Sequence, residues 1–188
     1  MEFVKSFKDT KIVKWLFVAL MGSIILAISS KIKIPFYPVP MTMQTLIVLI
    51  IGIGFGWKLG VATIALYLFE GIIGLPVFSG SPEKGVGIVY FTGPTMGYLL
   101  GFLFAAYFSG KFVYDNNIFK NFLKLFFATS LIYIFGIAWL GSLIGWDKPI
   151  IQLGIKPFLL AELFKILIAT FAINKICLLY TSPSPRDK

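Results

Sequence analysis

The chain has 188 residues, of which 58% are hydrophobic and only 13% are charged, and its mean hydropathy is +0.90. A water-soluble fold of this size cannot bury so much apolar surface, so the composition excludes that class and predicts an integral membrane protein. The absence of histidine and the single cysteine, Cys177, exclude an intrachain disulfide, His/Cys zinc and haem sites, and histidine-dependent nucleophilic catalysis.

The formal net charge of +9 does not indicate nucleic-acid binding in this context. Lysines spread between hydrophobic segments more often set the orientation of a chain in a membrane. Because backbone groups in lipid must be hydrogen-bonded locally, the apolar segments are expected to be helices. We therefore predict an all-α fold, an integral membrane bundle of six transmembrane helices that occupies residues 13–176.

The first predicted element is a short basic N-terminus, residues 1–12, on the cytoplasmic side. A retained first span over about 13–30 leads into the loop 31–40, where three prolines cannot continue a helix. A second span over about 41–56 ends at a tight turn around Trp57 and Lys58. The third span, about 59–74, stops before Pro76.

The loop 75–90 holds three glycines and two prolines and is too polar to face lipid. The remaining spans are expected over about 91–110, 125–144 and 157–179, separated by a basic connection at 111–124 and a hydrophilic bend at 145–156. Residues 181–188 are abruptly polar and contain the chain's only arginine, Arg186, which indicates a break in composition that starts near Cys177. Residues 177–188 form the predicted tail, which is expected to be non-native or disordered, with a short native tail as the alternative.

Lysines in alternate connections predict the orientation. The larger set, on the side of both termini, is Lys5, Lys8, Lys11, Lys14, Lys58, Lys111, Lys120, Lys124 and Lys175, and the smaller set is Lys31, Lys33, Lys84, Lys148 and Lys156. Both termini are therefore expected in the cytoplasm, with the Pro/Gly-rich loops outside.

Polar side chains at membrane depth are costly and are candidates for function. Those near span ends are Thr42, Gln44, Glu70, Thr95, Tyr98, Glu162 and Lys165. Glu162 and Lys165 are three residues apart and share one helix face, which fits either a mutual ion pair or ligand contact equally well. Glu70 fits solvation at the interface slightly better than a ligand contact.

Small residues recur every four positions in the first span, at Ala19, Ser23 and Ala27. This stripe allows close helix approach, either inside the bundle or with a partner helix, and spacing does not separate the two. The glycine-rich segment 52–58 lacks the spacing of a nucleotide-binding loop, so ATP hydrolysis is not expected in this chain.

Three separated motifs, IPFYPVPMTMQTL (34–46), YLFEGIIGLPVF (67–78) and GPTMGYLLGF (93–102), resemble the BioY family over about residues 14–176. BioY proteins are the biotin-specific S components of energy-coupling-factor (ECF) transporters. The chain departs from the family pattern at Ala161-Glu162, which replaces Gly-Asp, at Met96, and in the sequence SGSPEK after Phe78.

The resemblance implies a multi-pass subunit of a prokaryotic cell membrane that captures biotin from outside. An ECF transmembrane coupling protein and two ATPase subunits would drive its release inward, so this chain would be neither an enzyme nor a holder of a cofactor or metal. It also favours the stripe on the first span as the coupling-protein interface. The substrate-binding residues it implies are Gln44, Lys84, Tyr90, Thr95, Glu162 and Lys165.

Within that set, Glu162 would accept hydrogen bonds from the ureido N–H groups of biotin, and Lys165 or Lys84 would pair with its carboxylate. The alternatives are an S component for a different vitamin and a structural membrane protein without a ligand. An intramembrane enzyme fits least, since histidine and clustered carboxylates are absent from the sequence.

Overall fold

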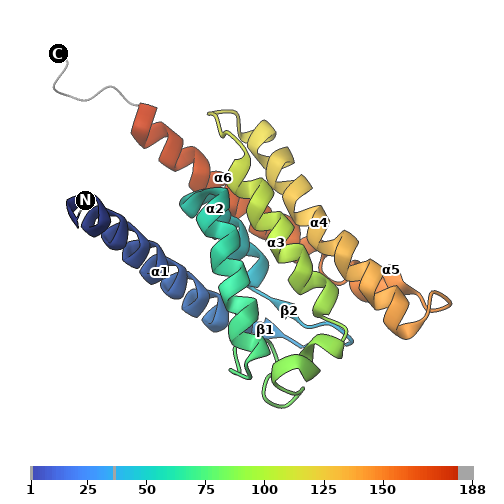
Figure 1. Ribbon diagram of the computed structural model, residues 1–188. Coiled ribbons are helices and arrows are strands. Elements are labelled where there is room, and N and C mark those ends of the chain that lie inside the picture. Colours follow the sequence, from blue (N-terminus) through green and yellow to red (C-terminus); the bar gives the residue numbers. More distant parts are fainter. Residues whose placement is uncertain (1, 36, 182–188) are drawn as a thin grey trace.

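The computed structural model describes residues 2–35 and 37–181, with side-chain detail for residues 12–35 and 37–173. Over these residues the chain is a helical bundle with one small ribbon, in which β1 (Lys33–Ile34) pairs antiparallel with β2 (Met41–Thr42) (Figure 1). Lys33 lies opposite Thr42 and Ile34 opposite Met41. The ribbon closes the proline-rich loop that follows the first helix.

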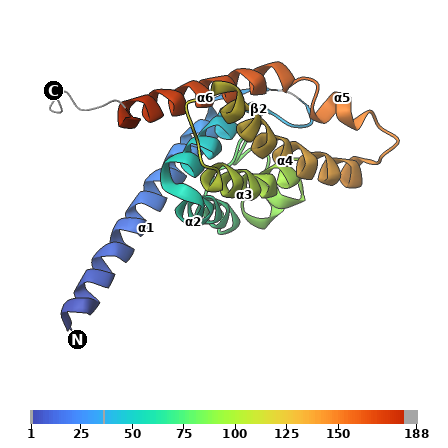
Figure 2. The same cartoon turned by 90° about the horizontal axis from the view of Figure 1, so that it is seen from above.

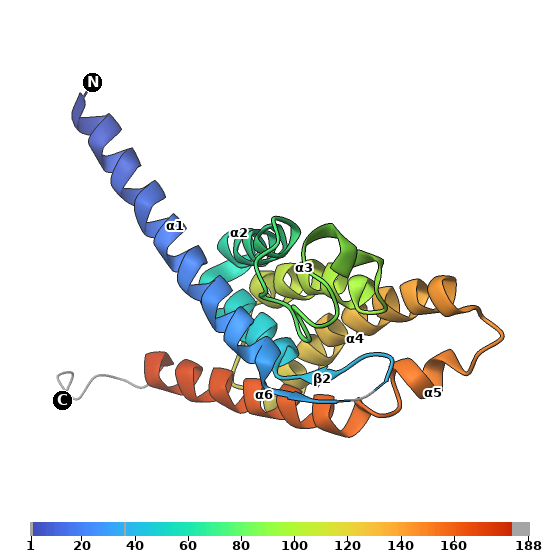
Figure 3. The ribbon, with the colours of Figure 1, turned by 90° about the horizontal axis from the view of Figure 1, so that it is seen from below.

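Helix α1 (Glu2–Lys31) is longer than the sequence predicted. Residues 2–12 contain neither proline nor glycine, so nothing in the polar N-terminus interrupts the helix. The N-terminal half of α1 projects away from the other helices (Figures 2 and 3). Val13 and Phe17 are accordingly exposed.

Helix α2 (Gln44–Ile72) contains both the second and the third predicted spans. Gly56 has φ 73° and ψ 167°, which no helix accommodates, and the chain reverses there. A straight helix would separate Gln44 from Tyr67, 23 positions later, by roughly 34 Å. Instead the Gln44 Nε2 atom donates to the Tyr67 hydroxyl over 2.8 Å, so α2 is a hairpin of two antiparallel arms.

The remaining elements are η1 (Gly87–Thr92), α3 (Met96–Lys111), α4 (Ile118–Ile144), α5 (Ile150–Gly154) and α6 (Leu159–Thr181). Helix α4 begins seven residues before the predicted span because Asn117 caps it, its side chain accepting from the Lys120 N–H over 3.0 Å. The backbone of α6 continues to Thr181, into the predicted tail, and residues 182–188 lie outside the described part.

The helices pack in the order α1, α2, α3, α4, α6, and α6 also contacts α2. Gly52 on the first arm of α2 lies so close to Ala106 and Ser109 of α3 that a Cβ atom there would collide with both. The two most heavily packed helices of the bundle are therefore held together through a residue without a side chain.

Three loops gather at one end of the bundle. Lys165 Nζ reaches the Thr42 carbonyl, Tyr98 Oη donates to the Gly154 carbonyl over 2.9 Å, and Trp139 Nε1 donates to the Gly93 carbonyl over 2.9 Å. These contacts tie the loops 31–43, 75–95 and 145–158 to the ends of α3, α4 and α6. The predicted exterior loops thus lie together, where they can cover a pocket.

By length and composition, three described helices could cross a bilayer: α1 from Ile12, α2, whose 29 residues are divided between its two arms, and α4. Large apolar side chains such as Ile28, Phe69, Ile134, Leu160 and Phe164 remain exposed on the outside of the bundle. A soluble monomer rarely exposes so much apolar surface, whereas a lipid-facing shell requires it. The predicted class of a helical, multi-pass membrane bundle is confirmed.

Candidate ligand-binding site

A small cavity of about 50 Å³ lies beneath the gathered loops. Its apolar wall includes Val39, Leu99, Phe102, Ile132, Tyr133 and Phe158, and its polar groups include those of Gln44, Thr45, Ser79, Tyr90, Thr95 and Glu162. Apolar walls with a few oriented polar groups are typical of small-molecule sites. Such sites enclose roughly 300–1,000 Å³, so the walls of this cavity must part to admit a ligand.

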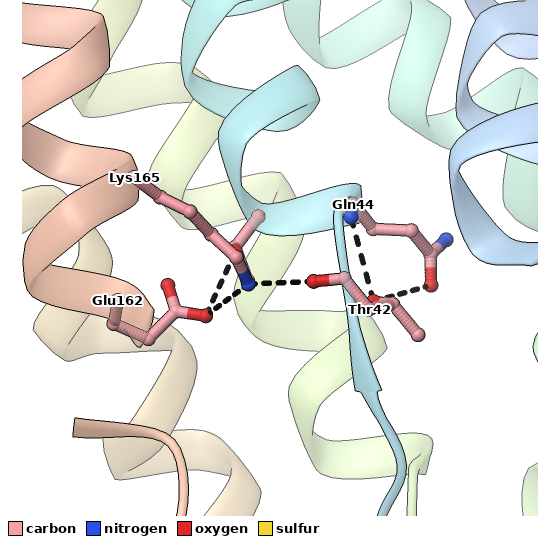
Figure 4. A network of polar contacts seen from close by, with 5 residues as sticks. Thr42, Gln44, Glu162 and Lys165 are labelled. Carbon is pink, nitrogen blue, oxygen red and sulfur yellow. Dashed lines mark hydrogen bonds and ion pairs between the residues drawn. The ribbon is translucent and has the colours of Figure 1, made fainter. Parts of the chain in front are cut away.

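Glu162 and Lys165 form a buried ion pair at the base of the cavity, with exposed fractions of 6% and 5%. Lys165 Nζ lies 2.6 Å from Glu162 Oε1, 3.0 Å from Thr45 Oγ1 and 2.5 Å from the Thr42 carbonyl (Figure 4). An ammonium group has three donors, and these three acceptors engage all of them. Lys165 has no donor left for a ligand in this conformation.

The carboxylate of Glu162 is only half satisfied. Oε1 accepts from Lys165 and from the Thr45 hydroxyl, the latter over 3.0 Å. Oε2 is buried and has no hydrogen-bond partner among the described residues. The side chain lines the cavity beside Tyr133. A buried carboxylate oxygen without a donor is costly, so this position favours a ligand that brings an N–H or O–H group.

Gln44 is fixed from both sides of its amide. Its Nε2 donates to the Tyr67 hydroxyl, which in turn donates to the Val77 carbonyl over 3.0 Å. Its Oε1 accepts from the Thr42 hydroxyl over 3.3 Å. This chain of bonds connects the start of α2 to the loop that follows the hairpin.

Tyr90 and Thr95 enter the cavity from η1 and from the residue that precedes α3. Tyr90 Oη donates to the Ser79 carbonyl over 2.6 Å, and burial raises the pKa of this phenol, so the hydroxyl stays protonated and keeps this hydrogen bond. Four of the predicted substrate-binding residues, Gln44, Tyr90, Thr95 and Glu162, therefore lie around one cavity.

Lys84 is exposed and does not line the cavity. The aliphatic part of its side chain lies against Gly80. A different lysine holds this loop: Lys31 Nζ donates to the carbonyls of Phe78 and Ser81 over 3.0 and 2.9 Å. The structure thus places Lys84 apart from the site and gives Lys31 a supporting role that the sequence did not indicate.

A second cavity of about 470 Å³ lies between α4 and α6. Its walls are apolar and include Phe126, Ile134, Ile137, Leu159, Leu163 and Ile166. Tyr133 and Glu162 line both cavities, so these two side chains form the partition between the small polar cavity and the larger apolar one.

The small-residue stripe of α1 packs partly inside the chain's own bundle. Ala19 and Ser23 are buried, Ala27 is half-buried, and the Ser23 hydroxyl donates to Glu70 Oε1 over 2.8 Å. Glu70, which the sequence left between solvation and ligand contact, thus has a partner on α1. Docking of a coupling protein on this stripe stays a prediction.

Comparison with known proteins identifies the family. The model of the BioY family matches residues 4–182, nearly the whole chain. The chain belongs to the BioY family. A protein of Pyrococcus horikoshii named "Probable biotin transporter BioY" is 31% identical over 86% of this chain and 91% of its own length. The biotin transporter BioY of Thermotoga maritima is 32% identical over 77% of this chain and 85% of its own.

A crystal structure of the S-component for biotin from an ECF-type ABC transporter superposes with a TM-score of 0.74. It shares 23% sequence identity, and the match covers 89% of this chain and 93% of that one. At this identity the superposition establishes the fold. The expected S-component architecture of this BioY-family chain is confirmed.

Sequence reasoning missed several residues of the site in this BioY-family chain. Thr45 follows Gln44 directly within the first motif, and Tyr133 is a single phenol in an apolar span, so both carried a weak signal. Ser79 and Lys31 carried none, because a loop serine and a lysine at a helix end are most often solvated.

Proposed function

We propose that this protein captures biotin from the exterior face of a prokaryotic cell membrane and delivers it inward with an ATP-driven energising module. The names of its curated relatives support biotin as the ligand. The observation that carries the proposal in this chain is the unpaired Glu162 Oε2 in a cavity with aromatic and aliphatic walls.

The chemistry of biotin matches this arrangement. Its ureido group has two N–H donors and one carbonyl acceptor, its ring is an apolar thioether, and its tail ends in a carboxylate. A ureido N–H directed at Glu162 Oε2 would replace the missing partner with a charge-assisted hydrogen bond. Tyr133 and Phe158 can cover the ring.

Lys165 has a positioning role in this proposal. Its ammonium group holds Glu162 Oε1 and the Thr42 carbonyl, so it fixes the carboxylate between α6 and the start of α2. No lysine or arginine is among the residues found to line the cavity. The ligand's carboxylate would therefore be bound by neutral donors or lie toward the loops, and neither Lys84 nor Lys165 would pair with it without rearrangement.

The energising module would consist of an ECF transmembrane coupling protein and two ATPase subunits. The sequence of this chain lacks the spacing of a nucleotide-binding loop, which supports a separate source of ATP hydrolysis. We propose α1 as the docking element, because its N-terminal half stands clear of the bundle (Figure 2).

Biotin binding by the purified protein in detergent tests this function. We expect saturable binding of one biotin per chain by isothermal titration calorimetry, with thiamine and riboflavin as controls that leave the signal unchanged. A protein that ignores biotin but retains another vitamin would be an S component of different specificity. A protein that binds none of them would overturn ligand capture.

A further inference from the structure

The loop after the α2 hairpin borders the cavity at Ser79. We call its residues 77–81 the strap. Its backbone carbonyls are held by side chains from three elements. The Val77 carbonyl accepts from Ser30 of α1 over 2.7 Å and from Tyr67 of α2, and the Ser79 carbonyl accepts from Tyr90 of η1. The Lys31 ammonium group donates to the carbonyls of Phe78 and Ser81. The strap is therefore fixed although it has no regular structure.

Phe78 anchors the strap in the core. It is almost fully buried, its ring stacks on Tyr90 with 4.7 Å between centroids, and it meets Tyr67 edge-on at 5.3 Å. With Phe78 inserted among these rings, its neighbour Ser79 is presented to the cavity that it lines.

The hydroxyl of Ser79 is the unexplained group on the strap. Ser79 is 4% exposed, and its Oγ atom has no hydrogen-bond partner among the residues that the structure describes. Ser81, two positions later, satisfies its own hydroxyl with the Phe78 carbonyl over 2.7 Å. Leaving a buried hydroxyl unpaired costs free energy, so its position on a fixed strap requires a reason.

Ser79 of the strap and Glu162 of α6 line the same small cavity, and each has a side-chain oxygen, Oγ and Oε2, without a hydrogen-bond partner among the described residues. We propose that Ser79 is a further ligand-contacting residue, whose hydroxyl donates a hydrogen bond to a carbonyl or carboxylate oxygen of the ligand. This inference rests on the proposed function.

The two oxygens are chemically complementary. An ionised carboxylate only accepts hydrogen bonds, whereas a serine hydroxyl can donate one. Together they select a small molecule with an apolar body, an N–H donor on one part and an oxygen acceptor on another. Biotin has this pattern, and a hydrocarbon or lipid chain does not.

The substitution Ser79→Ala tests the inference because it removes the hydroxyl and little else. We expect biotin affinity to fall about five- to tenfold in calorimetry, the loss of one neutral hydrogen bond. The ligand-free protein should keep its melting temperature or gain slightly, because the deleted group has no partner to lose. A purely structural role for Ser79 would instead lower the melting temperature of the ligand-free protein.

Ser29→Ala is the matched control. Ser29 is equally buried, but its hydroxyl donates to the Leu26 carbonyl within α1 and it does not line the cavity. Its removal should leave biotin affinity unchanged. If wild-type protein binds biotin and Ser79→Ala binds it equally well, the Ser79 contact is refuted and the proposed function stands. If the wild-type protein does not bind biotin, both the proposed function and the Ser79 contact are refuted. If Ser79→Ala lowers the melting temperature of the ligand-free protein, Ser79 has a structural role and the ligand contact is refuted.

Discussion

The ion pair between Glu162 and Lys165 shows how one residue can serve both folding and binding. Each charge alone would be costly to bury, and the 2.6 Å contact together with Thr45 and the Thr42 carbonyl offsets that cost. Every donor of Lys165 is used, while one oxygen of Glu162 remains free. The two residues thus form a mutual ion pair, and Glu162 also offers one acceptor to a ligand. Both interpretations of their three-residue spacing, an ion pair and a ligand contact, are compatible with this geometry.

Substitutions within this pair should separate the two roles. Lys165→Met leaves a buried carboxylate without its cation, and we expect it to cost roughly 3–5 kcal/mol, a fall in melting temperature on the order of 10 °C. Glu162→Gln should weaken biotin binding by roughly 1.5–3 kcal/mol through loss of the charged acceptor. Thermal melts and calorimetry in detergent measure both effects.

The control for charge removal is Lys148→Met. Lys148 pairs with Asp147 at 3.6 Å, but both side chains are more than half exposed, and such a surface pair contributes little. Its loss should change neither stability nor affinity. Wild-type affinity in both Glu162→Gln and Lys165→Met would show that the buried pair only supports the fold.

At the scale of elements, the α2 hairpin places the site. Its reversal at Gly56 brings the start and the end of α2 to the same end of the bundle, so that Gln44 can meet Tyr67 and Tyr67 can hold the strap at Val77. An uninterrupted helix would carry Tyr67 to the opposite end. The two arms are short, roughly 18 and 24 Å.

We expect Gly56→Ala to destabilise the protein by about 1–3 kcal/mol, because a Cβ atom is not tolerated at φ 73° and ψ 167°. Gly54→Ala is the matched control two residues earlier. A Cβ at Gly54 meets nothing within 4 Å, and alanine favours a helix over glycine by about 1 kcal/mol. Thermal melts should therefore move in opposite directions, and an equal response would show that the reversal does not depend on glycine.

At the scale of the whole molecule, the spans alternate so that the loops over the cavity lie at one end and the α2 reversal at the other. Lys31 at the end of α1 meets the strap, whereas the Gly56–Trp57 reversal packs against Gly110 at the end of α3 (Figure 1). Which end faces the cytoplasm is not fixed by packing. It depends on the lysine distribution, which favours the reversal on the inside.

Cysteine labelling of intact cells tests this orientation. In a Cys177→Ser background, Glu83→Cys on the cavity side should react with a membrane-impermeant maleimide, and Lys58→Cys at the reversal should react only after the cells are opened. Both native residues are exposed, so access to the reagent depends on the side of the membrane. The reverse pattern of labelling would place the cavity in the cytoplasm.

The sequence by itself determined the class of the protein, the approximate positions of the spans and the shared helix face of Glu162 and Lys165, because hydropathy and helical spacing are local properties. It also located the reversal near Trp57 and, through three motifs, the BioY family. It misplaced helix starts where a polar stretch without a breaker continues a helix, as before Val13, or where a cap such as Asn117 lies outside the apolar run.

Only the tertiary structure decided which polar groups are satisfied. Thr45 and Glu162, 117 positions apart, share a hydrogen bond, and Lys165 reaches back to Thr42. These contacts use up the donors of Lys165, leave Glu162 Oε2 and Ser79 Oγ open, and place Lys84 outside the cavity. Hydrogen bonds between distant segments depend on how the helices pack, and no local pattern in the chain records that packing.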